Sequence, residues 1–185
     1  MNAVNIARTP FIALRHARIG RVGEQGLLPA SWRAEHAEHF EVVDVHSPTP
    51  PWITITFDFA ADIPGQYAGF SLGDYLPAPP SARVAITGAY SFEGWSNVEL
   101  AVVLLREWRP GGAMVGQSAQ SISIDGAQQF RTVVHRFSDE GGLAQPVFLV
   151  KRQSPGPGSA SVTLRGLAFG LVDEYPGWLE AATGR

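Results

Sequence analysis

The sequence predicts a single all-β domain, a jelly roll in which about eight or nine antiparallel strands form a two-sheet sandwich. Apolar and polar residues alternate along several segments, with the period of a half-buried strand. Proline, glycine, serine and aspartate separate these segments at short intervals, and these residues favour turns. No repeat of propeller or solenoid length is visible, and the loops suit a jelly roll better than an immunoglobulin-type domain.

The first clear strand is predicted at 52–59, where isoleucine and phenylalanine alternate with threonine and aspartate. A shorter β-rich run precedes it at 41–46. Three prolines lie in the connecting segment 47–51. Because proline restricts its own torsion and that of the residue before it, this segment is expected to be an extended turn.

The next predicted strand lies within 81–92 and has two distinct phases. One phase is apolar and is expected to face the core, whereas Arg83 and Thr87 on the other are expected to face solvent. A proline-rich linker, 77–80, precedes it. Further strands are predicted at 119–124, 128–137, 146–152 and 159–169.

Segment 98–105 is almost entirely apolar, which is typical of a central strand covered on both faces. Ser96, followed three residues later by Glu99, also resembles a helix capping box, so periodicity alone leaves a helix open. A strand is favoured because β-branched residues are frequent here and strand patterns lie on either side.

Charge is unevenly distributed along the chain. Four arginines are the only charged side chains before Glu24. Residues 24–185 therefore carry the remaining 10 basic residues (14 minus 4) and all 17 acidic ones. We expect residues 1–25 to be a basic arm, 26–175 the jelly roll and 176–185 a tail. The arm suits an acidic partner or nucleic acid, or is a solvated tail, and we favour docking on a protein subunit without nucleic acid. The arm residues are Arg8, Arg15, Arg18 and Arg21.

The composition also excludes some chemistry. There is no cysteine, which rules out a disulfide framework, a thiol nucleophile and a zinc site built on sulfur. No apolar run reaches the ~20 residues of a membrane helix, and the start lacks the apolar centre of a signal peptide. We therefore expect no membrane insertion, and synthesis in the cytoplasm.

No motif identifies an active site, and we expect no catalytic residue, metal or cofactor. His36 and His39 stand three residues apart, but they lack the spacing and the adjacent glutamate of a zincin helix. There is no Gly-x-Ser-x-Gly elbow and no phosphate-binding glycine loop. A pair of acids for glycoside hydrolysis stays open, although 17 acidic residues offer such pairs by chance. The acids considered are Asp58, Glu93, Glu99 and Glu107.

Aromatic and polar side chains suit the recognition of a ligand better than catalysis. An exposed indole offers a sugar ring an apolar platform, while neighbouring polar groups bind its hydroxyls. Trp95 lies in a predicted turn and Trp108 is flanked by charged residues, so both are candidates for exposure, although most rings are expected in the core. A basic face for an acidic polysaccharide is the second candidate, built from Arg83, Thr87, Arg131 and His135.

Segment 23–32, read as Gly-Glu-Gln-Gly-Leu-Leu-Pro-Ala-Ser-Trp, resembles the opening of a family of carbohydrate-binding-module-like jelly rolls. That family occurs on phage virion and tail-fibre proteins and on gene transfer agent head spikes. The resemblance covers residues 23–173, implies a fold that includes Trp32, and carries over no specific binding residue. Further segments follow in the family's order at 63–67, 83–92, 96–100, 111–113, 128–131 and 162–172.

The resemblance implies a non-catalytic module that binds cell-surface polysaccharide from a phage-like particle, extracellular after release, with its arm docked on other subunits. A millimolar sugar site supplies only about 4 kcal/mol, so display in an oligomer is expected. The alternative is a particle subunit that packs against its neighbours and binds no glycan. An enzyme that cleaves polysaccharide is the third hypothesis.

Overall fold

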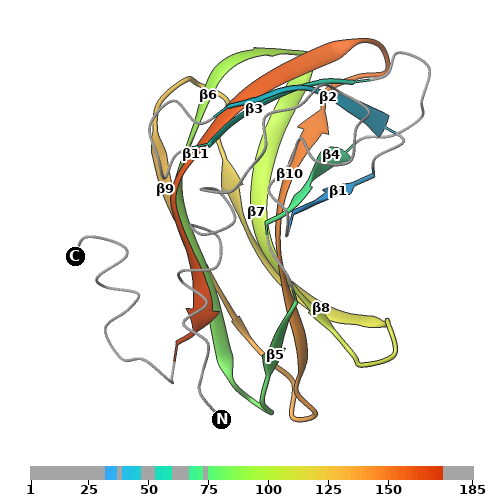
Figure 1. The fold of residues 1–185 in the computed structure, drawn as a ribbon, viewed down its shortest axis with the longest axis vertical. Helices are drawn as coiled ribbons and strands as arrows, with labels where there is room; N and C mark the ends of the chain where they lie inside the picture. The colour runs from blue at the N-terminus through green and yellow to red at the C-terminus, as the bar shows by residue number, and fades with distance from the viewer. Residues whose placement is uncertain (1–31, 37–38, 47–52, 60–66, 73–74, 173–185) are drawn as a thin grey trace.

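Two antiparallel sheets form the fold in the computed structural model, which describes residues 32–36, 39–46, 53–59, 67–72 and 75–172 (Figure 1). In path order, sheet A comprises β1 (Arg33–Glu35), β4 (Tyr67–Ser71), β10 (Gly142–Arg152), β7 (Val98–Trp108) and β8 (Met114–Ile122), with β5 (Leu76–Ala78) also paired to β10. Sheet B comprises β2 (Phe40–His46), β3 (Ile53–Phe59), β11 (Gly158–Leu171), β6 (Arg83–Ser96) and β9 (Gln129–Arg136). The predicted two-sheet antiparallel sandwich is therefore confirmed.

The described strands number eleven, more than the eight or nine expected. Each of the eight predicted segments is a strand, and the additional ones are β1, β4 and β5. These have three, five and three residues, too few to show an alternating pattern in the sequence. Strand β8 begins at Met114 rather than at residue 119, because residues 114–118 show little apolar alternation and form a strand by pairing with β7.

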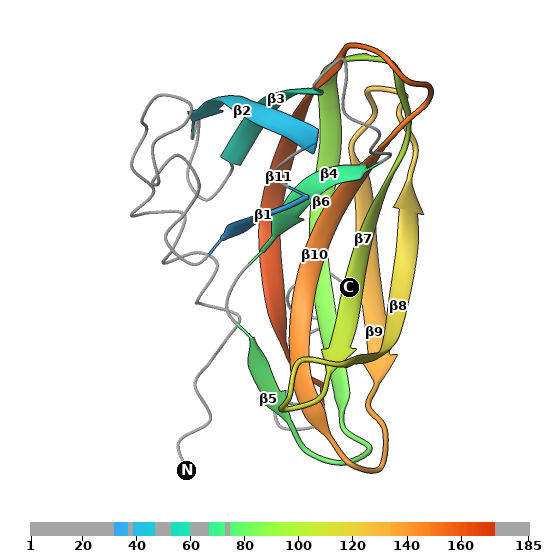
Figure 2. The same cartoon turned by 90° about the vertical axis from the view of Figure 1, so that its right-hand side faces the viewer.

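Strand β7 settles the choice between strand and helix for 98–105. It pairs with β10 on one side and β8 on the other, so it is central in sheet A, and Figure 2 shows these three strands side by side. Its inward residues join the core, whereas on the outer face Leu104 forms a small buried cluster with Val147 and Leu149. Apolar residues on both faces explain the nearly continuous apolar run.

The joining of β4 to β10 depends on a glycine. Gly69 lies opposite Leu149 in the register of these two strands. A Cβ atom at Gly69 would lie 2.0 Å from the Phe148 carbonyl oxygen, far inside van der Waals contact. Strand β4, and β1 beyond it, can therefore pair with the rest of sheet A only because no side chain is present at this position.

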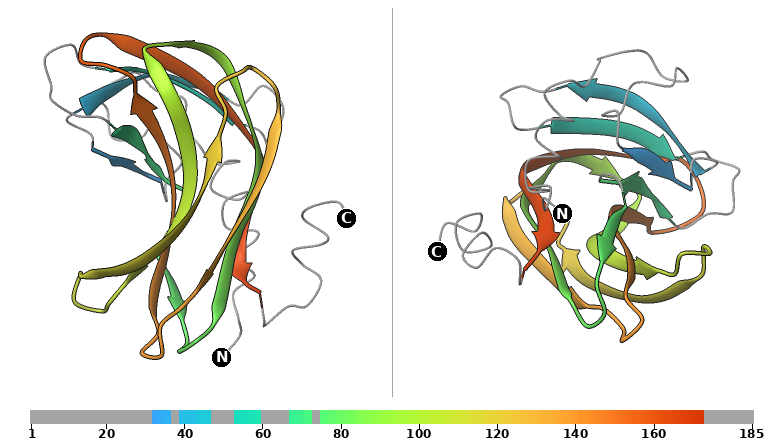
Figure 3. Two further views of the ribbon diagram at one scale, coloured as in Figure 1. Left: turned by 180° about the vertical axis from the view of Figure 1, so that it is seen from behind. Right: turned by 60° about the horizontal axis from the view of Figure 1, so that its bottom comes forward.

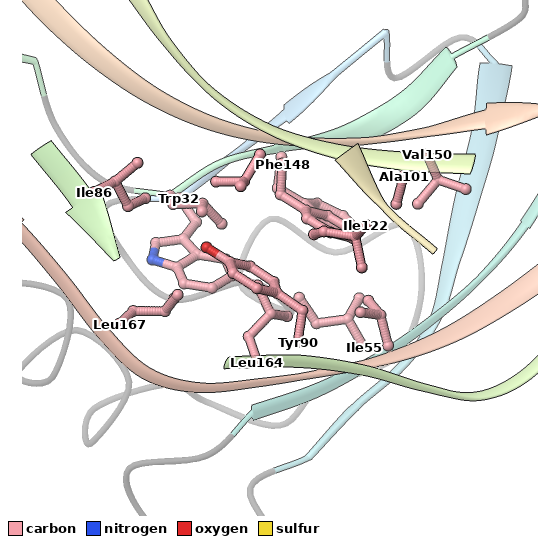
Figure 4. Close-up of a cluster of buried hydrophobic side chains, with 14 of the residues drawn as sticks. Trp32, Ile55, Ile86, Tyr90, Ala101, Ile122, Phe148, Val150, Leu164 and Leu167 are labelled. Atoms are coloured by element: carbon pink, nitrogen blue, oxygen red, sulfur yellow. The ribbon is translucent and has the colours of Figure 1, made fainter. Parts of the chain in front are cut away.

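The core lies between the sheets and is built from the inward residues of both (Figure 4). Trp32, which the resemblance includes in the fold, is buried within this core. The ring of Tyr90 from sheet B stacks on Phe148 from sheet A, with ring centroids 5.8 Å apart. Burial raises the pKa of the Tyr90 phenol, and its hydroxyl has no hydrogen-bond partner among the described residues.

Several expectations concern residues outside the described part of the chain. These are the basic arm with Arg8, Arg15, Arg18 and Arg21, and the tail 176–185. Within the described residues, no helix is long and apolar enough to cross a membrane.

Candidate functional site

The predicted basic face does not form, because its four residues lie on opposite faces of sheet B. The pairing of β6 with β9 sets Arg83 opposite Arg136 and Thr87 opposite Thr132, on the outer face. The same pairing sets Arg131 opposite Gly88 and His135 opposite Val84, on the face toward sheet A. Alternation within one strand predicts which of its residues share a face. The register between neighbouring strands decides which of these sets lie on the same face of the sheet.

Two of these residues are also buried, contrary to the expectation of an exposed polar surface. Thr87 is fully buried, and its hydroxyl lies 2.8 Å from that of Thr132. His135 is 8% exposed and lies between the edges of the two sheets. Of the other two, Arg83 is exposed, whereas Arg131 is half-buried and donates from Nε to the Ser121 carbonyl oxygen at 2.8 Å.

The buried carboxylate of Glu107 holds His135 in place. Nε2 of His135 lies 3.0 Å from Oε2 of Glu107, and the Ser138 hydroxyl donates to Oε1 at 2.6 Å. Burial acts to raise the pKa of Glu107, but the hydrogen bonds from Ser138 and His135 outweigh it, and the pKa lies below its ordinary value of 4.5. The other imidazole nitrogen, Nδ1, lies 2.9 Å from the Ser118 hydroxyl, so this network links β7, β8 and β9.

The two candidate tryptophans are in different environments. Trp95, near the end of β6, is 42% exposed and packs its ring edge-on against Phe92. Trp108, at the end of β7, is half-buried on the outer face of sheet A. Strand β7 has 11 residues and separates the two, so they lie roughly 30 Å apart and cannot form one platform.

Trp108 begins a chain of hydrogen bonds across the outer face of sheet A. Its indole Nε1 donates to Oε1 of Gln145 at 2.8 Å, and the Gln145 amide donates to Oε1 of Glu35, also at 2.8 Å. Glu35 accepts a further bond at Oε2 from Nη1 of Arg106 at 2.7 Å. We call these four residues the Trp108 network. The network holds polar groups from β1, β7 and β10 in fixed positions beside a half-buried aromatic ring.

A second polar group lies farther along the same face. Lys151 on β10 pairs with Glu99 at 2.7 Å, and Tyr67 on β4 lies opposite Lys151 in the sheet. The hydrogen bond from Lys151 to the Glu99 carboxylate raises the pKa of Lys151, although partial desolvation acts against it. Tyr67 is 36% exposed, so an aromatic residue also borders this end of the outer face.

The histidine pair and the considered acids do not come together as a reactive centre. The rings of His36 and His39 stack at 5.2 Å, and Nδ1 of His39 lies 3.0 Å from the Tyr67 carbonyl oxygen. Within the described ranges, no cluster of three or more His, Cys, Asp or Glu residues could hold a metal ion. Glu93 accepts a hydrogen bond from Thr163 on sheet B, and so lies on a different sheet from Glu99 and Glu107.

The sequence marks Trp108 as a candidate but does not indicate which residues it contacts. Glu35 and Gln145 are separated by 110 residues in the chain, and Glu35 and Arg106 by 71. No local pattern marks such pairs. The available signal was that Arg106 and Gln145 are polar residues that directly border the apolar ends of the predicted strands 98–105 and 146–152.

Comparison with known proteins yields structural likeness without sequence likeness. No protein-family model matches the chain, and no curated protein sequence matches it. A solved CBM4 structure, a carbohydrate-binding module, aligns with a TM-score of 0.57 at 13% identity, covering 90% of this chain and 99% of that one. The chain therefore has the β-sandwich fold of carbohydrate-binding modules.

Two further structures align with lower scores. A family 11 carbohydrate-binding module from Clostridium thermocellum, in complex with a mixed-linked tetrasaccharide, has a TM-score of 0.46 at 13% identity, covering 80% of this chain and 96% of that one. The enzymatically active domain of bacteriophage CBA120 tailspike protein 4 has a TM-score of 0.48 at 14% identity. That alignment covers 77% of this chain but only 19% of the tailspike chain.

Proposed function

We propose that the chain is a non-catalytic module that binds a glycan on the outer face of sheet A. The Trp108 network is the observation that carries this proposal. A half-buried indole lies beside an amide, a carboxylate and a guanidinium whose positions are fixed by mutual hydrogen bonds. Sugar recognition needs this combination of an apolar ring surface and polar groups in fixed positions.

Preorganisation is what distinguishes this face from an ordinary polar surface. Immobilising a long side chain on binding costs about 0.5–1.5 kcal/mol. Arg106 and Glu35 are already held together, with side chains only 14% and 18% exposed. A glycan hydroxyl that reaches either group therefore meets a side chain whose freedom was lost during folding.

The charges of this face favour a neutral glycan over a strongly acidic one. Arg106 is paired with Glu35, and Lys151 with Glu99. The basic surface that would suit an acidic polysaccharide required Arg83, Arg131 and His135 on one face, and the register of sheet B separates them. Each basic residue of the two groups on sheet A has its charge balanced by a neighbouring carboxylate.

The absence of catalysis is part of the proposal. Ser118, His135 and Glu107 have the composition of a hydrolase relay, but Ser118 lies opposite Leu105 on the inward phase of β8. Its hydroxyl therefore faces the space between the sheets. This placement supports a structural role for the relay, as does the separation of Glu93 from the other acids.

As the biological setting, we propose a subunit of a phage-like particle that is released from the cell and adheres to host surface polysaccharide. The uneven charge of the chain supports docking of the basic arm on other subunits. Single sugar sites are weak, and display in several copies raises avidity by roughly 10² to 10⁴.

Binding to a glycan array, followed by calorimetric titration of the best ligand, tests the proposed site. Replacing Trp108→Ala should lower affinity at least about tenfold, since stacking and the anchor of Gln145 are both lost. Trp95→Ala removes an exposed tryptophan from the other end of the molecule and is the matched control. If Trp95→Ala loses binding while Trp108→Ala keeps it, the site lies elsewhere. If the folded wild type binds no glycan, the proposed function is wrong.

A further inference from the structure

Strand β8 is unusual among the described edge strands because it carries neither a charged residue nor a proline, two of the features that normally prevent edge-to-edge pairing. Natural edge strands are protected by charges, prolines, bulges or short length. Strand β8 has nine residues and none is charged, and no charged residue lies between Arg109 and Asp125. It ends sheet A beside β7.

The other edge strands are protected. Strand β1 has three residues, two of which are charged, and β5 contains Pro77. Strand β2 carries Glu41 and Asp44 and has a bulge between Val42 and Asp44. Strand β9 carries Arg131 and Arg136. Among the described edge strands, β8 is therefore the one with neither a charged residue nor a proline, although its register against β7 shifts between Gly116 and Met114.

Hydrogen bonds at one end of β8 reveal which backbone groups face its free edge. The Ser121 carbonyl oxygen accepts from Arg131, and the Ser123 backbone exchanges two bonds with the Gln129 side chain, all on the side away from β7. Backbone groups alternate in direction along a strand, so those of Ala119 and Gln117 point to the same free edge. Within the described residues, no hydrogen bond reaches them there.

This part of β8 is also accessible. Gln117 and Ala119 are exposed, and Met114 and Val115 are 50% and 40% exposed. Figure 3 shows the β7–β8 hairpin projecting from the body of the molecule, and Figure 2 shows β8 at its margin. The edge thus combines unpaired backbone groups with exposed apolar side chains.

We propose that β8 pairs with β8 of a second copy of this chain, antiparallel and about a two-fold axis near Gln117. A two-fold contact brings each strand against itself, so a charged strand would meet its own charge, whereas β8 carries none. Gln117 then lies opposite the same residue of the second copy, where the two amides can bond to each other.

Pairing of this kind joins the two copies of sheet A into one continuous sheet. An axis perpendicular to the sheet keeps both outer faces on the same side, so both Trp108 networks face the same direction. This consequence for avidity rests on the proposed glycan site. The pairing itself stands on the edge alone and does not depend on whether a glycan binds.

Sedimentation over a range of protein concentrations, without glycan, tests the pairing. The wild type should form a dimer, and Gln117→Lys should raise its dissociation constant about tenfold or more because two like charges then lie opposite each other. Val134→Lys adds the same charge at an exposed apolar residue of β9 and is the matched control. A wild type that stays monomeric at every concentration, or a dimer that survives Gln117→Lys, overturns the proposal.

A cross-linking variant gives an independent measurement. The chain has no cysteine, so Gln117→Cys introduces a single thiol. Hydrogen-bonded antiparallel neighbours have Cα atoms about 5.5 Å apart, within the range of about 4.4–6.8 Å that disulfides span. Mild oxidation should convert this variant to a covalent dimer, whereas Val134→Cys should stay largely monomeric under denaturing electrophoresis. Equal cross-linking of both variants contradicts pairing through β8.

Discussion

The outer faces of sheets A and B use their polar groups in different ways. On sheet B, short hydroxyl side chains pair with one another across strands: Thr54 with Thr163 at 2.8 Å, and Thr56 with Ser161 at 3.0 Å. On sheet A, long side chains from three strands meet around Trp108. The hydroxyl pairs join neighbouring strands through short side chains, whereas in the Trp108 network the buried Gln145 links the partly buried Trp108 and Glu35. This contrast is the reason for placing ligand binding on sheet A.

The largest effect is expected when β4 is forced off sheet A. Gly69→Ala places a methyl group against the Phe148 carbonyl, and because the obstacle is backbone, the strands must separate. We expect a loss of about 3 kcal/mol or more in the free energy of unfolding, measured with urea. Gly94→Ala is the control, since a Cβ there meets nothing within 4 Å. Equal stability of the two variants would show that β4 contributes little to sheet A.

If the Gly69→Ala protein folds, it also tests whether the outer face of sheet A binds the glycan. Glu35 lies opposite Gly69 in the pairing of β1 with β4. Displacement of these strands should therefore weaken the glycan binding that we propose for sheet A. Unchanged affinity in that variant would separate Glu35 from the binding face.

An intermediate effect is expected at the Glu107 network, which links the edges of the two sheets. Glu107→Ala leaves His135 and Ser138 without their buried acceptor, and should cost about 3 kcal/mol at pH 7. The folded pKa of Glu107 lies below its ordinary value of 4.5, so its stabilising contribution is complete above that pH and is lost as the pH falls through the folded pKa.

Melting temperatures at several pH values measure this contribution. The difference between wild type and Glu107→Ala should be largest near neutral pH and should shrink under acid conditions. A difference that grows as the pH falls would reverse the sign of the linkage. Glu99→Ala, at an exposed carboxylate of the same strand, is the matched control and should change stability little.

The smallest effect is expected on sheet B. Thr87→Val removes one hydroxyl of a partly buried pair and should cost about 1 kcal/mol, while the double variant with Thr132→Val should recover part of that loss. Chemical denaturation of the two single variants and the double variant measures the coupling. Glycan affinity should stay unchanged in all three, and a clear loss would show that sheet B takes part in binding.

Features that depend on neighbouring residues were predicted correctly from the sequence, whereas features that depend on residues distant in the chain were missed. Strands such as β3 and β6 were found because alternation and turn residues are local signals. Strands β1 and β4 were missed because they are short and form only by pairing with a partner far along the chain. The exposure of Thr87 and His135 was predicted wrongly, because alternation shows which face of its own strand a residue lies on but not what packs against that face.

The sequence by itself determined the antiparallel sandwich, the position of eight strands and the absence of cysteine chemistry. Each depends on neighbouring residues or on composition. Only the tertiary structure decided that Arg83 and Arg131 lie on opposite faces, that Trp95 and Trp108 are far apart, and that Glu35 meets Gln145. The physical reason is strand register, since a shift by one residue exchanges the two faces of a strand, and register is set by partners that are distant in the sequence.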